Sequence, residues 1–329
     1  MSEPNLHKPS SSTPMLRFAG ITIPKWVVFS LLTIVLYGLM GVVAKFASNT
    51  ISPLLVQVIS SFGMIPLLGV LIFTGKAKKE VSGNLRYGIT FSALIGLLSV
   101  LAAISQYVAF SKGGPASIVV PVISLSSLVT VLLAIYMFKE KLNRYQIAGI
   151  VFSIIAIMMF NEGGGDLQKV SEPWWKTLSS SWMLFSLLAL FAAGTAQLFI
   201  KAATNHVSSD FVTIVVLITT LVLTVVFVFL QTFSWKMSAN DLIACLVVGI
   251  LGSAAFFTQS IAYSSGMASL VAPLCSLFPV VTVVVSAIFL GEKLTPIIIL
   301  AVIISSTAGI TISIEKKTIE KATVDTDSQ

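Results

Sequence analysis

Apolar runs of about 20 residues recur along the whole of this chain of 329 residues. An α-helix of that length spans a hydrocarbon core about 30 Å thick. Because a bilayer offers no water to backbone polar groups, such runs form helices rather than open strands. We place ten of them, at about residues 26–46, 53–74, 88–110, 115–138, 145–160, 180–202, 210–231, 241–263, 268–290 and 295–314. The sequence therefore predicts an all-α membrane protein with ten transmembrane helices.

Composition agrees with this class and argues against others. Hydrophobic residues make up 56% of the chain and charged residues only 10%, whereas a typical soluble domain has about 25% charged residues. Cys245 and Cys275 lie inside apolar runs, where cysteine usually behaves as a small buried hydrophobe. We find no His, Cys and acidic cluster, no nucleophile paired with a base and no ATP-binding loop. We therefore expect no metal, no cofactor, no enzyme activity and no ATP-driven pumping.

The basic residues predict an orientation. If the N-terminus is cytoplasmic, 14 of the 20 Lys and Arg residues fall in cytoplasmic tails and loops, as the positive-inside rule requires. The sequence thus predicts a multi-pass protein of the plasma (inner) membrane with both termini in the cytoplasm. The net charge of +7 then needs no nucleic-acid partner. The expected partners are the lipid bilayer and a small-molecule substrate, and a monomer and a homodimer are both compatible with the sequence.

The second half of the sequence repeats the first. Residues 116–142 align with residues 268–294 at a shift of 152, with 12 of 27 positions identical, and residues 29–49 align with 185–205 at a shift of 156. Each half holds five predicted helices, an odd number, so the second copy enters the membrane inverted. The predicted organisation is a cytoplasmic tail (1–25), a first repeat (26–160), an external linker (161–179), a second repeat (180–314) and a cytoplasmic tail (315–329).

The aligned segments end on FKEKL (138–142) and LGEKL (290–294). FKEKLNR, which is predicted to lie inside, has three basic residues, and LGEKLTP, which is predicted to lie outside, has one. We expect Glu140 and Glu292 to cap or orient the loops that lead to the fifth and tenth helices rather than to bind substrate.

These motifs resemble a known family. A helix that begins ASxxxP and closes on KEKL or GEKL, together with YGLMGVVAKFASN in the first helix, resembles the EamA-type transporters of the drug/metabolite transporter superfamily over about residues 27–314. The resemblance implies a cavity formed largely by helices 1, 3 and 4 and their copies 6, 8 and 9. It also implies transport of small metabolites such as amino acids, and related branches move nucleotide sugars or sugar phosphates.

Polar residues within membrane spans are the candidates for a substrate site. Lys45 and Lys201 occupy aligned positions on helix faces that carry glycine, and the alternative is that both extend to the membrane interface. Gln106 and Gln259 are also aligned, and either amide could bind substrate or bridge helices. The predicted substrate-binding set is Tyr37, Lys45, Gln106, Ser124, Gln197, Lys201, Gln259 and Ser276.

Pro121 and Pro273 are predicted kinks or hinges in the fourth and ninth helices, where a proline leaves a backbone carbonyl without its usual partner. The spans hold no Asp or Glu away from their ends, so the sequence supports no coupling carboxylate.

The function that we expect is secondary transport, most simply export, of a small polar or amphipathic, amino-acid-like metabolite by alternating access. Two alternatives stay open: a flippase for a lipid-linked sugar, and a membrane receptor or assembly subunit that does not transport.

Overall fold

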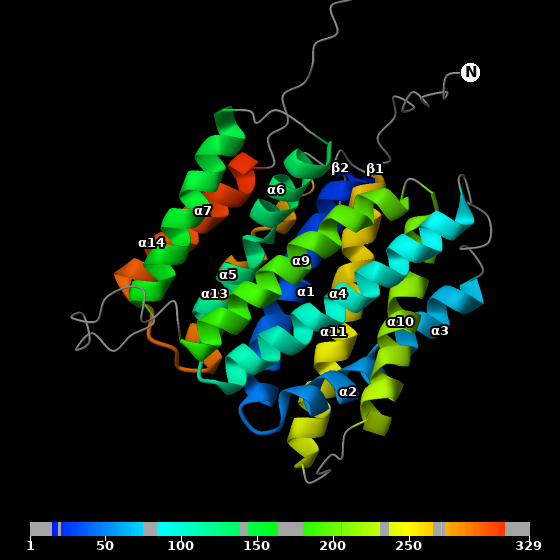
Figure 1. Ribbon diagram of the computed structural model, residues 1–329, viewed down its shortest axis with the longest axis horizontal. Coiled ribbons are helices and arrows are strands. Elements are labelled where there is room, and N and C mark those ends of the chain that lie inside the picture. The colour runs from blue at the N-terminus through cyan, green and yellow to red at the C-terminus, as the bar shows by residue number, and fades with distance from the viewer. Residues whose placement is uncertain are drawn as a thin grey trace, which may run out of the picture.

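The computed structural model describes residues 15–18, 21–74, 84–138, 144–163, 180–204, 206–230, 237–265, 271 and 274–312. In this part the chain is almost wholly helical (Figure 1). The exception is an antiparallel hairpin of β1 (Met15–Phe18) and β2 (Ile21–Pro24), which directly precedes the first helix. Ile21, Thr22 and Ile23 are β-branched and favour extended backbone. The hairpin corrects the all-α prediction in this one place.

Six helical segments of the described chain are long and apolar enough to cross a membrane. They are α1 (Lys25–Ser48), α2 (Pro53–Gly63) together with α3 (Ile65–Thr74), α4 (Leu85–Ser111), α9 (Ser181–Thr204), α10 (Ser209–Leu230) and α11 (Ala239–Ser265). Further apolar helices are α5 (Ala116–Ser124), α6 (Ser126–Phe138), α7 (Arg144–Gly163), α13 (Phe278–Phe289) and α14 (Pro296–Ile312). They lie where the sequence predicts the fourth, fifth, ninth and tenth helices.

Two helices that we predicted as continuous are interrupted. The run at 53–74 breaks at Met64, two residues before Pro66, which has no amide hydrogen to donate to the helix. The run at 115–138 breaks at Leu125, and beside the break the Ser124 hydroxyl donates to the Pro121 carbonyl at 2.7 Å. The Leu125 amide instead donates to the Val122 carbonyl at 3.2 Å, which tightens the last turn of α5.

Helices of the two halves pack against each other (Figure 1). α1 packs against α11 and α13, and α9, which aligns with α1 in sequence, packs against α4 and α6. α2 likewise packs against α11, and α10 against α4, while α7 and α14 form a pair of their own. The halves therefore interlock, and the same kinds of helix pair occur twice.

The α1–α13 and α9–α6 contacts use the same residue types at aligned positions. The Thr282 hydroxyl donates to the Gly38 carbonyl at 3.0 Å, and the Thr130 hydroxyl donates to the Gly194 carbonyl at 2.8 Å. Thr130 and Thr282 align at the shift of 152, and Gly38 and Gly194 at the shift of 156. Because glycine has no side chain, the helices approach closely enough for each threonine hydroxyl to reach the glycine carbonyl of its neighbour.

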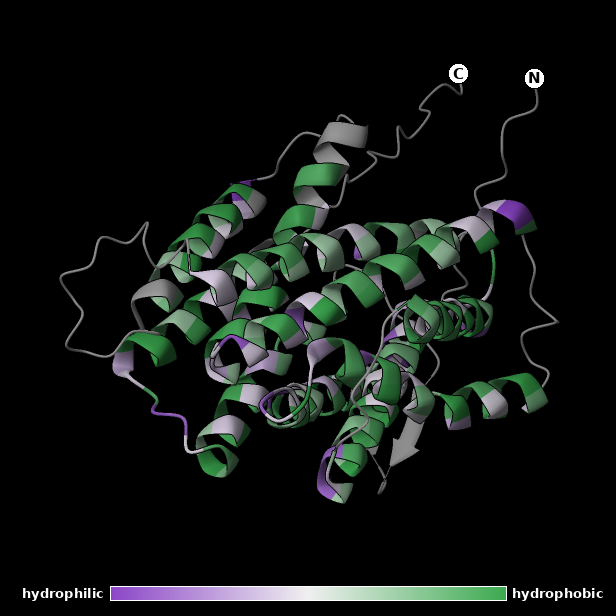
Figure 2. Cartoon of the chain, turned by 60° about the horizontal axis from the view of Figure 1, so that its bottom comes forward, coloured by the Kyte–Doolittle hydropathy of each residue, from purple (hydrophilic) through white to green (hydrophobic). Residues whose placement is uncertain are grey.

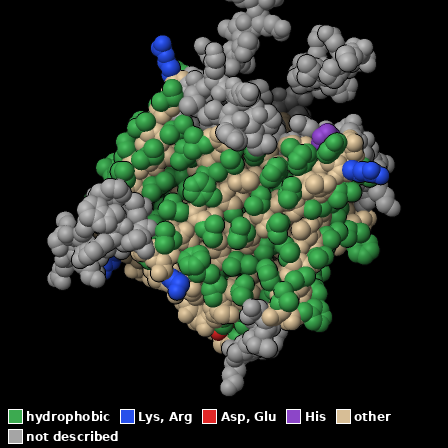
Figure 3. All heavy atoms as spheres, viewed as in Figure 1, with side chains coloured by type: hydrophobic (Ala, Val, Ile, Leu, Met, Phe, Trp, Pro, Cys, Tyr) green, Lys and Arg blue, Asp and Glu red, His purple; other side chains and the backbone are tan. Residues whose placement is uncertain are grey.

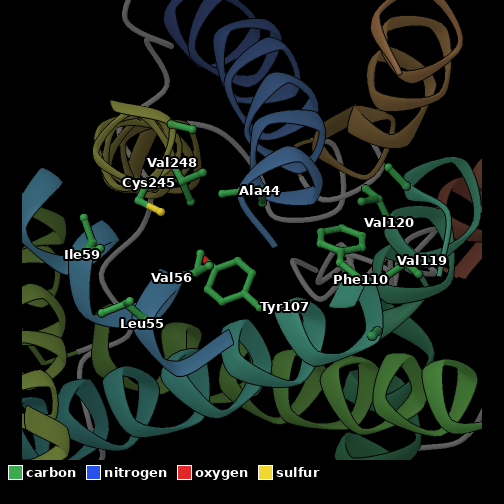
Figure 4. Packing of buried hydrophobic residues seen from close by; sticks show 14 residues of the cluster. Ala44, Leu55, Val56, Ile59, Tyr107, Phe110, Val119, Val120, Cys245 and Val248 are labelled. Atoms are coloured by element: carbon green, nitrogen blue, oxygen red, sulfur yellow. The ribbon is translucent and has the colours of Figure 1, made fainter. Parts of the chain in front are cut away.

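A hydrophobic core joins α1, α2, α4, α5 and α11. Figure 4 shows Tyr107 and Phe110 of α4 among side chains that include Ala44, Val56 and Val120. All five are almost fully buried. This core fixes the ends of α4 and α5 against α1.

The outer surface is also apolar. Hydrophobic side chains cover most of the face shown in Figure 3, and the Lys and Arg side chains lie at its margins. Figure 2 likewise shows hydrophobic residues along most of each helix. Phe73 is 91% exposed and Phe229 85% exposed, which would be unfavourable in water but costs nothing against lipid. The surface is that of an integral membrane protein.

Candidate functional site

A cavity of about 270 Å³ lies between the helices of the two halves. None of the described residues that line it is charged. Its polar lining residues are Tyr37, Gln57, Ser60, Ser99, Gln106, Tyr107, Ser124, Ser126, Ser127, Gln197, Thr220, Ser253, Gln259, Tyr263 and Ser276. The cavity can therefore hold a small molecule through hydroxyl, amide and aromatic contacts, without a fixed charge.

The structure brings together six of the eight substrate-binding candidates. Tyr37, Gln106, Ser124, Gln197, Gln259 and Ser276 all line this one cavity. They come from α1, α4, α5, α9, α11 and the turn before α13, so widely separated segments converge on it. Their role in binding stays a prediction.

Lys45 has a different place. Its Nζ donates to the Phe110 carbonyl at 3.0 Å and lies 5.8 Å from the centre of the Phe110 ring, outside the lining of the cavity. It therefore joins the end of α1 to the end of α4. Lys201 lies in α9, but its side chain is outside the described part of the structure, and so is Pro273. Pro121 is buried within α5.

Polar side chains in and beside the cavity bond to one another. The Gln197 amide nitrogen on α9 donates to the Ser126 hydroxyl at the start of α6, at 2.9 Å. Gln57 on α2 donates to Ser61 at 3.2 Å, and Thr224 on α10 donates to the same Ser61 hydroxyl at 2.7 Å. These bonds hold amides and hydroxyls in fixed positions at the helix interfaces.

The interface between α1 and α13, which aligns in sequence with the one between α9 and α6, is aromatic. The Tyr37 ring lies 5.6 Å from the Phe278 ring, and the Tyr37 hydroxyl donates to the Gln259 amide oxygen at 3.3 Å. Phe278 aligns with Ser126 in the sequence repeat. Equivalent interfaces thus present different chemistry to the same cavity. The substrate-binding set predicted from the sequence lacks Ser126 and Phe278, although their departure from the repeat is visible in the sequence.

Two carboxylates join the halves at one end of the bundle. The Glu292 side chain accepts from the backbone amides of Ala116 and Ser117, at 2.7 and 2.9 Å. Asp241 accepts from the Thr50 hydroxyl at 2.8 Å. We expected Glu292 to cap the loop to the tenth helix, but it caps α5 of the other half, because the fold brings that helix end beside it. Glu140 lies outside the described residues.

Comparison with known proteins bears on both halves. The pattern of the EamA-like transporter family matches residues 24–161 and again residues 180–314. A "Probable amino-acid metabolite efflux pump" of Salmonella typhimurium is 26% identical over 280 residues, which cover 81% of this chain and 87% of that protein. An uncharacterized protein of Methanocaldococcus jannaschii is 31% identical over 135 residues, which cover 41% of this chain but 95% of that protein.

The fold also has a counterpart among solved structures. One crystal structure superposes with a TM-score of 0.60 at 15% sequence identity, over 88% of this chain and 96% of the other. At that identity the likeness concerns the fold alone.

Proposed function

The chain belongs to the EamA-like transporter family, and from this premise we propose that it is a secondary transporter that exports a small, amphipathic, amino-acid-like metabolite by alternating access. The cavity between the halves is the observation that carries the proposal. It is lined by helices of both halves, and it has the size for a small molecule.

The chemistry of the cavity supports an amphipathic substrate without net charge. A charged lining residue would favour an ion of the opposite sign, and none is present among the described lining residues. The Gln197 and Ser126 side chains can exchange hydrogen bonds with polar groups. The Tyr37 and Phe278 rings offer an apolar surface to the rest of the molecule. The efflux-pump name of the Salmonella relative supports an amino-acid-like compound and the outward direction.

We also propose that the transporter is made of two inverted five-helix units with ten spans. The family pattern matches each half separately, and the Methanocaldococcus protein is almost covered by a segment about as long as one half. The recurring helix pairs, and the two aligned Thr–Gly hydrogen bonds, fit an axis that relates the halves. The loop charges support two cytoplasmic termini in the plasma membrane.

Flux into proteoliposomes tests the proposal. Purified protein is reconstituted, a cell metabolite extract is added outside, and the accumulated compounds are identified by mass spectrometry. We expect saturable uptake of one or a few neutral, amphipathic metabolites, with empty liposomes as the first control. Gln197→Ala should reduce the uptake about tenfold by removing a polar contact, whereas Thr307→Val, at an exposed position away from the cavity, should leave it unchanged.

Two results would contradict the proposal. Absence of substrate-dependent flux under any imposed gradient would reject transport. Movement of a lipid-linked sugar across the bilayer, without uptake of soluble metabolites, would favour the flippase alternative.

A further inference from the structure

Glu292 follows a sharp turn at the end of α13. The Leu290 amide donates to the Ser286 carbonyl at 2.9 Å, and Gly291 has a φ of 65°. A left-handed residue directly after a helix ends it, and glycine adopts that conformation without strain. The turn directs Glu292 away from its own helix and towards the first half of the chain.

The Glu292 carboxylate meets a helix end that needs an acceptor. Ala116 and Ser117 are the first residues of α5, so their amides have no partner within the helix. These amides also form the positive end of the helix dipole. Both residues are almost fully buried. Oε1 accepts from the Ala116 amide and Oε2 from the Ser117 amide. Such charge-assisted hydrogen bonds are stronger than those between neutral groups.

A second contact at this end also crosses between the halves. Asp241 of α11 binds Thr50, which follows α1. Glu292 and Asp241 both belong to the second half, and all their partners named here belong to the first. In the predicted topology this is the outer end of the molecule.

The contact made by Glu292 is linked to the cavity by α5 itself. That helix begins at the bonded amides and ends at the break at Leu125, where Ser124 and Ser126 line the cavity. Because α5 has only nine residues, a movement of its N-terminus would also move the residues of this helix that line the cavity.

We propose that Glu292 is a positioning residue that latches the outer ends of the two halves together, and that the cavity opens outwards only when its bonds to the Ala116 and Ser117 amides break. The inference rests on the proposed function, because it assigns a role in alternating access.

Cysteine accessibility tests the latch without knowledge of the substrate. Ala103, which lines the cavity, is replaced by Cys in a chain that carries Cys245→Ala and Cys275→Ala. A membrane-impermeant maleimide is added to intact cells, and separately to inside-out vesicles. The comparison is between Glu292 and Glu292→Gln. Lys293→Gln is the matched control, because Lys293 is the adjacent, exposed charged residue.

We expect Glu292→Gln to raise the labelling rate from outside about tenfold and to lower the rate from inside. A latch predicts these opposite changes, because opening one end of the cavity closes the other. Lys293→Gln should change neither rate.

A second variant guards against misfolding of the first. Ala116→Pro removes one of the two donors, and proline is compatible with the first position of a helix. The preceding Pro115 has φ −72° and ψ 145°, which suits a residue before proline. Ala116→Pro should likewise raise the labelling rate from outside and lower the rate from inside. Equal labelling of the wild type and both variants, or a rise from both sides, would overturn the latch. The flux assay decides the transport proposal separately.

Discussion

At the scale of single residues, the aligned glycines Gly38 and Gly194 control how closely helices approach. A Cβ atom at Gly38 would lie 2.5 Å from Cβ of Val281, and one at Gly194 would lie 2.6 Å from Cβ of Val129. Val129 and Val281 are themselves aligned in the repeat. Neither position can take a side chain unless the helices move apart.

We predict that Gly194→Ala lowers the free energy of unfolding by about 1–3 kcal/mol, since overpacked interiors lose that much. The measurement is thermal unfolding of the purified protein in detergent, with a reduced Tm expected. Gly69→Ala is the control, because in the described part of the chain no atom beyond its own helix turn and chain neighbours lies within 4 Å of the added Cβ. Equal Tm values for the two variants would show that the α9–α6 contact is not tight.

The sequence alone identified these glycines as part of the helix faces that carry Lys45 and Lys201. It could not place the Lys45 side chain, because the acceptor, the Phe110 carbonyl, is 65 residues away in the chain. It also identified six candidates that the fold gathers in one cavity. A polar residue in an apolar helix is visible in sequence, but the direction in which its side chain points depends on the neighbouring helices.

At the scale of helices and their contacts, the hydroxyls of Thr130 and Thr282 tie equivalent pairs together. We predict that Thr282→Val lowers the free energy of unfolding by about 0.6 kcal/mol, the average for a hydrogen bond between membrane helices. Thr130→Val should cost about the same. The two costs should add, since the interfaces are separate.

Unfolding in a mild detergent, followed by helix content against denaturant concentration, measures these costs. Thr307→Val is the control, because Thr307 is exposed and its hydroxyl donates within its own helix, to the Ile303 carbonyl. Costs no greater than that of the control would contradict the role of the two hydroxyls in helix packing.

Apolar runs located the helical segments well, because a segment that crosses a bilayer needs about 20 apolar residues and must satisfy its backbone hydrogen bonds as a helix. They did not predict the interruptions at Met64 and Leu125. Hydropathy averages over a window and does not register a local exchange of hydrogen bonds, such as the one between Ser124 and Pro121. The same average hid the β1–β2 hairpin in a segment that we assigned to a cytoplasmic tail.

At the scale of the whole molecule, the repeat was visible in sequence but its interlocking was not. The alignment shows that α9 resembles α1. It does not say that α1 lies against α11 and α13, or that α9 lies against α4 and α6. Those contacts place the Gln197–Ser126 pair and the Tyr37–Phe278 pair around a shared cavity. Because helices of both halves line the cavity, alternating access requires one half to move relative to the other.

Double electron–electron resonance in lipid nanodiscs tests that movement most directly. Spin labels at Lys112 and Lys293, which are exposed, report on the predicted outer end, and labels at the exposed Arg86 and Ser264 report on the predicted inner end. Each pair has one label in each half. The distances are recorded with and without the substrate found in the flux assay, and in the Glu292→Gln variant. We predict that the two distances change in opposite directions, the outer one increasing in Glu292→Gln while the inner one decreases. Distances that stay fixed, or that increase together, would contradict alternating access.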